Sequence, residues 1–589
     1  MPPRECGVVL ALALLAGCGG GPYKKVIVIG VDGMDPAFVE RHWADLPNLA
    51  RLRERGGYSH LATTDPPQSP VAWSTFITGL DPGQHGIFDF VHRDPATLEP
   101  YLSLDRTIGP RFALHLGPWE LPLSRSRVVS LRKGRAFWEY LADRGVPVTI
   151  VRIPANYPPA NAGHELAGMG TPDLRGTEGT FTYFTDDPTE TSREVPGGLI
   201  RKVEVNAGHV DLRVEGPPNS LRRDHAYSTA PLIVDIDPDR PYARLQVGNK
   251  LAIVRQGEWS DWLPADFPLL PRLVSVRGMF RVFAKQLRPR FELYISPVNI
   301  DPDAPALPIS SPASYARELA AGIGRWSTLG IPEDTAALRQ GVFDLPEFLS
   351  QSHLVLADEC RLLDYSLRRF TGGFLFFYFS SVDQNSHVLW GRHNAELLEI
   401  YRAMDRSIGE VMRREPQAEL MVMSDHGFAA FRRAVNLNTF LISRGFGRQA
   451  YALGLNGLYL RDKSMEEELR RALLDLRDPA NGQSVIARVT ETDPSPENRA
   501  IAPDLIVGYR AGYRASWQTA LGEAPPGVVV DNDDAWIADH CIDPREVPAV
   551  LFATRAIRIQ SPRLKDLPVS LLELYGVPRP PAMTGQSVF

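Results

Sequence analysis

The sequence KKVIVIGVDG, residues 24–33, is a run of mostly β-branched residues that ends in an aspartate and a glycine. An uninterrupted apolar run of this kind is typical of a strand that is buried on both faces of a parallel sheet. Residues 37–55 follow as a helical pattern that ends at Gly56 and Gly57. The start of the chain therefore predicts a strand followed by a helix, which is the repeating unit of an α/β fold.

The same alternation recurs along the chain, apart from one β-rich stretch. Buried strands are expected at 148–153, 373–379 and 420–423, and helices at 136–144, 315–323 and 395–413. In residues 197–300, short alternating segments are separated by turn-rich stretches, which predicts a β-rich inserted subdomain. The expected division is a leader at 1–17, a first α/β part at 18–196, the insertion at 197–300 and a second α/β part at 301–589.

The N-terminal residues have the features of an export signal. The apolar run at residues 7–15 is too short to cross a bilayer and has the length of a signal-peptide core. Leu15-Ala16-Gly17-Cys18 resembles the cleavage box of bacterial lipoproteins, in which the cysteine is acylated. A plain signal peptide and a wrongly placed start codon are the alternatives. We expect lipidation at Cys18 and a cell-envelope lipoprotein, on the periplasmic side of the outer membrane or at the cell surface.

Charge and cysteine content limit the possible partners. The chain has 64 Lys and Arg residues and 70 Asp and Glu residues, well mixed, for a net charge of −6. Without a basic run, no nucleic-acid-binding surface is expected. Cys360 and Cys541 would be the two cysteines left after processing, either paired or as two buried thiols. No pattern indicates the oligomeric state.

Three aspartates occupy equivalent places after predicted strands. Asp32 follows the first strand, Asp383 follows the strand at 373–379, and Asp425 follows the strand at 420–423. In open α/β sheets the ligand crevice lies at the carboxyl ends of the strands. Three carboxylates at one edge would repel each other unless a cation neutralises them, so we expect bound metal ions.

Histidines accompany these aspartates. His387 comes four residues after Asp383, His426 is adjacent to Asp425, and His540 lies in a loop far downstream. Mixed aspartate and histidine ligation suits Zn²⁺ or Mn²⁺. Two such ions a few ångströms apart can hold a phosphoryl group during in-line displacement.

Ser69 is the expected nucleophile. It precedes Pro70 at a predicted helix start, where serine is a natural N-cap and proline suits the first helical position. Gly79 can end this helix. An anion is favoured at such an N-terminus, because free N–H groups and the helix dipole point toward it. The alternative nucleophiles, which lack this combination, are Thr63, Thr64, Ser74 and Thr75.

Taken in order, these motifs resemble the type I phosphodiesterase/nucleotide pyrophosphatase family of the alkaline phosphatase superfamily. The resemblance rests on VIGVDG (28–33), WSTFITG (73–79), PGQHGI (82–87), Asp383 with His387, SDHG (424–427) and Asp539-His540. It implies an alkaline-phosphatase-like layered α/β/α sandwich. It also implies two zinc ions, with Ser69 between them forming a phosphoserine intermediate. One ion would be bound by Asp383, His387 and His540, and the other by Asp32, Asp425 and His426.

The resemblance leaves the reaction partly open. The family's nucleotide pyrophosphatases carry Pro-Asn two and three residues after the nucleophile, where this chain has Val71 and Ala72. We therefore expect hydrolysis of phosphodiesters or phosphomonoesters, without assignment to nucleotides. His85 and Arg93 could bind the substrate, although a structural role in a turn also explains His85. The alternatives are an envelope phospho-group transferase of the same superfamily and a surface lipoprotein that binds a partner without catalysis.

Overall fold

The computed structural model describes residues 23–589 of the chain. The expected leader at 1–17 and the lipidation site Cys18 lie outside the described residues. Within residues 23–589, none of the helices is both long enough and apolar enough to span a membrane.

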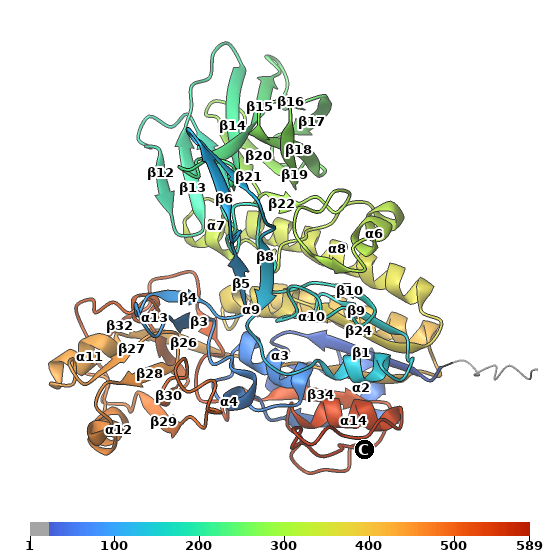
Figure 1. Ribbon diagram of the computed structural model, residues 1–589, viewed down its shortest axis with the longest axis vertical. Helices are drawn as coiled ribbons and strands as arrows, with labels where there is room; N and C mark the ends of the chain where they lie inside the picture. The colour runs from blue at the N-terminus through green and yellow to red at the C-terminus, as the bar shows by residue number, and fades with distance from the viewer. Residues whose placement is uncertain (1–22) are drawn as a thin grey trace, which may run out of the picture.

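An eight-stranded sheet forms the centre of the fold (Figure 1). The four strands expected from their apolar runs are adjacent in it, and they pair in parallel. The strand that contains residues 26–31 is central, because both of its edges are paired. In order across the sheet the strands are β2 (Gly57–Leu61), β34 (Ala549–Ala553), β25 (Glu419–Met423), β1 (Lys25–Val31), β24 (Gly373–Phe379), β9 (Val148–Val151), β10 (His164–Leu166) and β23 (Ser310–Ser311).

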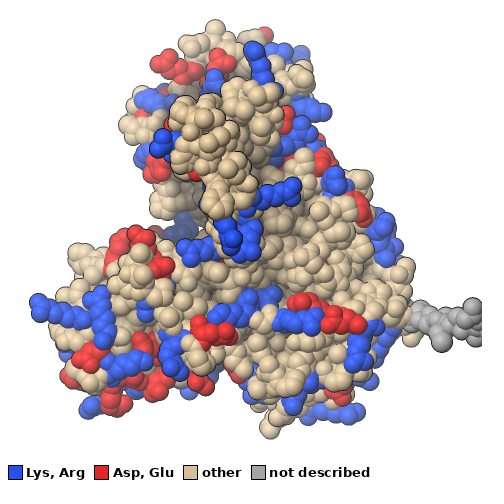
Figure 2. Space-filling view, in the orientation of Figure 1, with Lys and Arg blue, Asp and Glu red and all other residues tan. Residues whose placement is uncertain are grey.

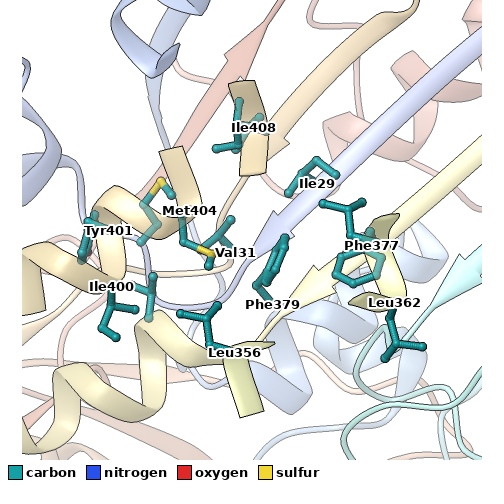
Figure 3. Close-up of a cluster of buried hydrophobic side chains, with 14 of the residues drawn as sticks. Ile29, Val31, Leu356, Leu362, Phe377, Phe379, Ile400, Tyr401, Met404 and Ile408 are labelled. Atoms are coloured by element: carbon teal, nitrogen blue, oxygen red, sulfur yellow. The ribbon is translucent and has the colours of Figure 1, made fainter. Parts of the chain in front are cut away.

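Helices cover both faces of this sheet. On one face, Ile29 and Phe377 pack with residues of α8 (Leu345–Arg369) and α10 (Asn394–Arg414), as the buried side chains in Figure 3 show. On the other face, Val28 and Phe376 pack with residues of three helices. Alternate residues of each strand therefore fill two separate cores, and the fold is the expected layered α/β/α sandwich. The three helices of the second face are α3 (Ser69–Thr78), α5 (Phe137–Ala142) and α14 (Asp566–Leu574).

Two helical segments differ from the expectation. Residues 37–55 form two helices, α1 (Pro36–Arg41) and α2 (Pro47–Arg55), and not one. The break occurs because Pro47 has no N–H to donate and keeps Leu46 out of the helical conformation. The 25-residue helix α8 was not expected, although Asp344 and Glu347 form a capping box at its start.

The β-rich insertion surrounds a core of its own. Its five-stranded sheet includes β11 (Phe181–Thr185) and β12 (Arg193–Val195), so it begins before residue 197, where the sequence had suggested its start. β11 pairs with β13 (Gly198–Lys202) and with β21 (Glu292–Ile295). The sequence separation between β11 and β21 is more than 100 residues. Local patterns do not reveal such distant pairing. The insertion has two further sheets. One contains β14 (His209–Pro218), β15 (Tyr227–Ile236), β16 (Tyr242–Val247) and β17 (Lys250–Arg255). The other contains β18 (Leu263–Leu270), β19 (Val274–Phe280) and β22 (Asn299–Ile300).

Two further units were not anticipated from the sequence. Residues 429–547 form a C-terminal module with a separate apolar core, shown in orange in Figure 1. Residues 105–130, called the arm below, rise from the middle of the molecule beside the insertion (Figure 1). The arm consists of two consecutive two-stranded ribbons, β5 (Asp105–Ile108) with β8 (Arg127–Ser130) and β6 (Ala113–Leu116) with β7 (Trp119–Pro122).

Candidate active site

The carboxyl ends of three central strands bring the predicted aspartates together. Asp32 directly follows β1, and Asp425 comes two residues after β25. Asp383 lies in the first turn of α9 (Ser381–Leu389), which begins just after β24, and His387 lies one turn further on the same helix face. These side chains are buried, as are those of His426 and His540.

Each of the three histidines is fixed through its Nδ1 atom. Nδ1 lies 2.8 Å from the carbonyl oxygen of Ala538 in His387, 2.7 Å from that of Pro67 in His540, and 3.2 Å from that of Gly427 in His426. A carbonyl oxygen can only accept, so Nδ1 carries the proton in each ring. Nε2 is then left with a lone pair, which is the form in which histidine binds a metal ion.

The three Nε2 atoms face carboxylates. In one group, Nε2 of His387 is 3.4 Å from Asp383 Oδ2, and Nε2 of His540 is 3.8 Å from Asp383 Oδ1. In the other, Nε2 of His426 is 3.2 Å from Asp425 Oδ2 and 3.5 Å from Asp32 Oδ1. Potential ligand atoms of Asp383, His387 and His540 lie within 4.8 Å of one another, and so do those of Asp32, Asp383 and His426. Asp383 thus stands between two candidate metal-binding groups.

The electrostatics of the cluster call for cations. Asp383 Oδ1 and Asp425 Oδ2 are buried and have no hydrogen-bond partner within residues 23–589. Burial raises the pKa of Asp383 to about 7, and burial followed by repulsion from Asp32 raises the pKa of Asp425 well above its ordinary value. Burial lowers the pKa of His387 to about 4, so its ring is neutral near pH 7. Oxygens without partners and neutral imidazoles are the ligand chemistry that divalent metal ions require.

Ser69 lies against this cluster. Its Oγ is 3.1 Å from His426 Nε2 and 3.4 Å from Asp32 Oδ1. The expectation that Ser69 is the N-cap was wrong, because Gln68 is the N-cap and Ser69 is the first residue of α3. The Ser69 hydroxyl is consequently not used to cap the helix and faces the metal-binding groups. Gly79 ends the helix as expected, in the left-handed conformation at φ 67°.

Comparison with known proteins identifies the family. The family model that describes type I phosphodiesterase/nucleotide pyrophosphatase matches residues 26–194 and 323–544, which is more than half of the chain. The chain belongs to the type I phosphodiesterase/nucleotide pyrophosphatase family. The protein is therefore a hydrolase of phosphate esters in the alkaline phosphatase superfamily, and the two matched segments contain Ser69 and all six predicted metal ligands.

Two solved structures are similar over nearly the whole chain. Phosphonoacetate hydrolase from Sinorhizobium meliloti 1021, in complex with phosphonoacetate, is 12% identical with a TM-score of 0.47, covering 94% of this chain and 96% of that one. Murine ectonucleotide pyrophosphatase/phosphodiesterase 5 is 9% identical with a TM-score of 0.42, covering 95% and 96%. A search of curated protein sequences found no match.

Three of the four alternative nucleophiles of this phosphodiesterase family member are hydrogen-bonded to other groups. The hydroxyls of Thr64 and Ser74 donate to the carbonyl oxygens of Pro66 and Pro70, at 2.7 and 2.6 Å. Thr75 Oγ1 is hydrogen-bonded to a histidine ring at 3.0 Å. The buried Thr63 hydroxyl has no partner in the described part of the chain. The Ser69 hydroxyl, in contrast, is hydrogen-bonded to Asp32 and His426 of the candidate metal-binding groups.

The possible substrate-binding residues have other roles. His85 is fully buried; its Nε2 contacts Thr75 Oγ1 at 3.0 Å, and its Nδ1 accepts from the Ile87 N–H at 3.2 Å. Both ring nitrogens are therefore occupied, and burial lowers the pKa of His85 to about 3. The guanidinium of Arg93 lies over the ring of Tyr459, 4.5 Å from its centroid. His85 is thus a structural residue, and Arg93 attaches the strand that contains it to the C-terminal module.

Asp32 is held by two residues that the sequence reasoning missed. Trp73 Nε1 and the Tyr378 hydroxyl both donate to Asp32 Oδ2, at 2.9 and 2.7 Å. Asp32 Oδ1 is thereby directed toward Ser69 and His426. Trp73 lies one helical turn after Ser69, and Tyr378 is on the face of β24 that points toward α3. Helical spacing and strand alternation were the available signals.

Replacing Tyr378 with phenylalanine should weaken metal binding about tenfold or more and lower kcat. The change removes one of the two donors that orient the Asp32 carboxylate. Metal affinity can be measured by titration with a chromogenic chelator. The control is Tyr509→Phe, whose buried hydroxyl has no partner within residues 23–589. Equal metal affinity of the Tyr378 variant and the wild type would remove this positioning role.

Asp539 is hydrogen-bonded to several groups beside the site, and its carboxylate, with His540 and Cys541, forms a further group of potential ligand atoms. Its carboxylate accepts hydrogen bonds from Arg514, from Trp536 Nε1 at 2.8 Å, and from the N–H groups of His540 and Cys541 at 2.8 and 3.0 Å. Burial opposes ionisation, but the Arg514 charge and the neighbouring histidines hold the pKa of Asp539 well below its ordinary value. The Trp536 ring in turn stacks on a candidate ligand, His387, with 3.6 Å between the ring centroids. The two cysteines are not paired, since Cys360 and Cys541 are both free thiols.

A second network ties Gln68, the residue before Ser69, to the C-terminal module. Gln68 Nε2 donates to Asp89 Oδ2 and to Asn456 Oδ1, at 2.8 Å each. Asn456 Nδ2 donates to the carbonyl oxygen of Cys541 at 3.1 Å, next to the candidate ligand His540. The residue before Ser69 and the residue after His540 are therefore linked through one asparagine. Val71 and Ala72, where the family pattern has Pro-Asn, are buried in the apolar core on that face of the sheet.

Two buried glutamates fix the start of α9. The Ser381 hydroxyl is 2.8 Å from Glu333 Oε1 and 3.2 Å from Glu359 Oε2, and the Ser380 hydroxyl contacts both glutamates at 3.0 Å. The nearby cation is Arg152, whose Nη2 lies 4.0 Å from Glu359 Oε1. Sequence reasoning missed this cluster because its members come from a loop, from α8 and from the start of α9.

The Glu333 carboxyl should make stability depend on pH. Burial, followed by the charge of Glu359, raises the pKa of Glu333 above its ordinary value of 4.5. Because the folded-state pKa of Glu333 lies above its unfolded value, ionisation of Glu333 favours the unfolded chain. The free energy of unfolding therefore falls as pH rises above about 4.5. In Glu333→Gln, Tm should therefore fall less between about pH 5 and pH 9 than in the wild type, by a few degrees.

The measurement is a thermal melt across this pH range. Glu347→Gln, which removes a partly exposed carboxylate paired with Lys285 at 2.6 Å, is the control and should keep the wild-type dependence. If Glu333→Gln and the wild type lose the same Tm over the range, the glutamate pair is not the source of the pH dependence.

Proposed function

We propose that the protein hydrolyses phosphodiesters or phosphomonoesters through a phosphoserine on Ser69, with two divalent metal ions. Zn²⁺ is the proposed ion, and Mn²⁺ is the alternative with the same ligand preferences. One ion would be held by Asp383, His387 and His540, and the other by Asp32, Asp425 and His426. The observation that carries the proposal is the convergence of Ser69 Oγ, imidazole Nε2 atoms and unpaired carboxylate oxygens in one buried cluster.

Each residue of the site would have a separate role in the reaction. Ser69 Oγ attacks phosphorus, so that a Ser69–phosphorus bond forms while the bond to the leaving alcohol breaks. Water then cleaves the phosphoserine, which releases the phosphate product and restores the hydroxyl. When bound, the ions would favour the Ser69 alkoxide and neutralise the phosphoryl oxygens. Trp73 and Tyr378 hold Asp32 in place throughout, and Gln68 holds the start of the helix.

Charge balance supports two ions over one. Asp32, Asp383 and Asp425 together carry three negative charges when ionised, and the three histidines are neutral donors. Two divalent cations would turn this into a net positive site, which attracts a phosphate ester. A single divalent cation would leave it negative and repel the substrate.

The test combines metal analysis with two substrates. Purified protein should contain close to two zinc ions per chain by mass spectrometry, and should hydrolyse p-nitrophenyl phosphate or bis-p-nitrophenyl phosphate. The preferred ester separates monoesterase from diesterase activity. Protein treated with a chelator should be inactive and should recover with Zn²⁺ or Mn²⁺. A protein that binds no metal and cannot be activated by either ion would refute the proposal.

We also propose that the enzyme acts in the cell envelope as a lipoprotein, attached through acylated Cys18. The support is the leader sequence that ends in Leu15-Ala16-Gly17-Cys18. Metabolic labelling with a radioactive fatty acid tests it. Label should enter the wild type and not Cys18→Ser, and an unlabelled wild type would exclude the anchor.

A further inference from the structure

The outer ribbon of the arm has one face that is entirely apolar. β6 and β7 pair so that Leu114 lies opposite Leu121 and Leu116 lies opposite Trp119. The Leu123 N–H donates to the Phe112 carbonyl oxygen, which extends the ladder by one pair in the same alternation. Side chains on one face of a ribbon recur every second residue. The shared face therefore consists of Phe112, Leu114, Leu116, Trp119, Leu121 and Leu123.

This face is exposed to solvent. The exposed fraction is 69% for Phe112, 48% for Leu114, 53% for Leu116 and 70% for Leu123, while Trp119 and Leu121 are half-buried. The opposite face carries polar residues, including His115 and Glu120, which contact each other at 3.7 Å. A contiguous apolar face on a protruding ribbon is costly to leave in water, and in soluble proteins it marks an interaction site.

The attachment of the arm to the insertion leaves that face open. The Glu120 N–H donates to the Leu221 carbonyl oxygen at 2.9 Å, and the Arg223 N–H donates to the Pro118 carbonyl oxygen at 3.0 Å. Both contacts are made by main-chain groups, which lie in the plane of the ribbon. The insertion thus steadies the arm along its edge, while the apolar side chains project away from the ribbon plane.

Four arginines of the arm flank the apolar segments in the sequence. Arg106, Arg111, Arg125 and Arg127 are all exposed. Among residues 23–589, none of the four takes part in a salt bridge; those near the arm are formed by other residues, such as His115 and Arg135. The acidic residues of the arm, residues 105–130, are Asp105 and Glu120. Figure 2 shows a broad area of uncharged side chains on the upper lobe, with Lys and Arg, and also Asp and Glu, at its margins.

We propose that the arm binds the surface of an anionic phospholipid bilayer. The apolar face enters the boundary between headgroups and acyl chains, as the apolar side of an interfacial amphipathic element does. The arginines contact lipid phosphates, and each basic residue near an anionic surface adds to the attraction. This inference goes beyond the hydrolytic activity and does not depend on it.

A second copy of the chain is a poorer occupant of this face. Two paired segments of five residues present an area on the order of 160 Å², whereas a stable interface buries about 800 Å² on each partner. A symmetric contact between two arms would also bring like patches together. The four arginines of one arm would then face those of the other, at a cost in repulsion.

Vesicle binding tests the proposal. All proteins are full-length and carry Cys18→Ser, so that no acyl chain contributes. Binding is measured by co-sedimentation with phosphatidylcholine vesicles and with vesicles that contain about 30% phosphatidylglycerol. The parent should prefer the anionic vesicles about tenfold or more, and the preference should shrink between about 0.05 M and 0.5 M salt. Equal binding to both vesicle types would overturn the proposal.

Variants locate the binding to the arm. Leu114→Ser/Leu116→Ser should bind anionic vesicles about tenfold less, and Arg125→Glu/Arg127→Glu about 25-fold less. The matched control is Leu251→Ser/Ile253→Ser, two exposed apolar residues of β17 in the insertion, which should bind as the parent does. Unchanged Tm and unchanged hydrolysis of a soluble ester show that the variants fold. An equal loss of vesicle binding in the arm and control variants would refute lipid binding by the arm. A parent protein that is a dimer in solution, with only the arm variants monomeric, would also refute it.

Discussion

Replacing Ser69 with alanine is expected to lower kcat for phosphate ester hydrolysis by about 10³-fold or more. The substitution removes the hydroxyl that contacts both Asp32 and His426, and with it the proposed covalent intermediate. Metal content should stay at the wild-type level, because the carboxylate and imidazole ligands remain. Activity is measured with a nitrophenyl ester, and metal content by mass spectrometry on the same preparation.

The matched control for this change is Ser74→Ala. Ser74 lies on the same helix and is equally buried, but its hydroxyl donates to the Pro70 carbonyl oxygen. Its loss should leave kcat within a few-fold of the wild type. Wild-type turnover in Ser69→Ala would place the nucleophile at another residue. Loss of metal in that variant would instead make Ser69 a ligand that the bound ions require.

We expect Asp425→Asn to be more stable than the wild type when metal is absent and less stable than the wild type when metal is bound. Without metal, burial and the charge of Asp32 raise the pKa of Asp425, so ionised Asp425 destabilises the fold as pH rises through the raised pKa. Asparagine removes that charge and can still accept the hydrogen bond from the Gly33 N–H, which is 3.2 Å from Oδ1. The chelator-treated variant should therefore have a higher Tm than the chelator-treated wild type near pH 8.

With excess Zn²⁺ the order should change, because the variant lacks a charged ligand. Its zinc content should fall toward one ion per chain, its Tm should rise less on adding zinc, and kcat should drop about a hundredfold or more. Asp405→Asn is the control: Asp405 is buried but binds the N–H groups of Asn48 and Leu49, away from the site. Unchanged zinc stoichiometry in Asp425→Asn would overturn the assignment of Asp425 as a ligand.

The sequence indicates the candidate metal ligands more clearly than the residues that hold those ligands in position, for a physical reason. Asp32, Asp383 and Asp425 each follow an uninterrupted apolar strand, and the carboxyl ends of parallel strands meet at one edge of the sheet. Their positions therefore follow from local pattern alone. Trp73 and Tyr378 could not be assigned in this way, since their contact with Asp32 depends on how α3 packs against β24.

The insertion and the C-terminal module show the same limit. β11 and β12 look like connecting segments until β13 and β21 pair with them. The module around residues 435–547 has the same apolar alternation as the rest of the second α/β part, so its separate core becomes visible only when its contacts are known. In contrast, α8 had a local signal in its capping box and could have been predicted.

The central position of β1 affects how the chain can fold. Its two neighbours, β24 and β25, are encoded about 350 and 390 residues later, so both of its edges stay unpaired until most of the polypeptide has been synthesised. A fragment that stops before residue 373 exposes an apolar strand with two open edges, which favours aggregation. The protein must therefore reach its native state after synthesis is nearly complete, and a cell that exports it must keep the unfolded chain from aggregating until then.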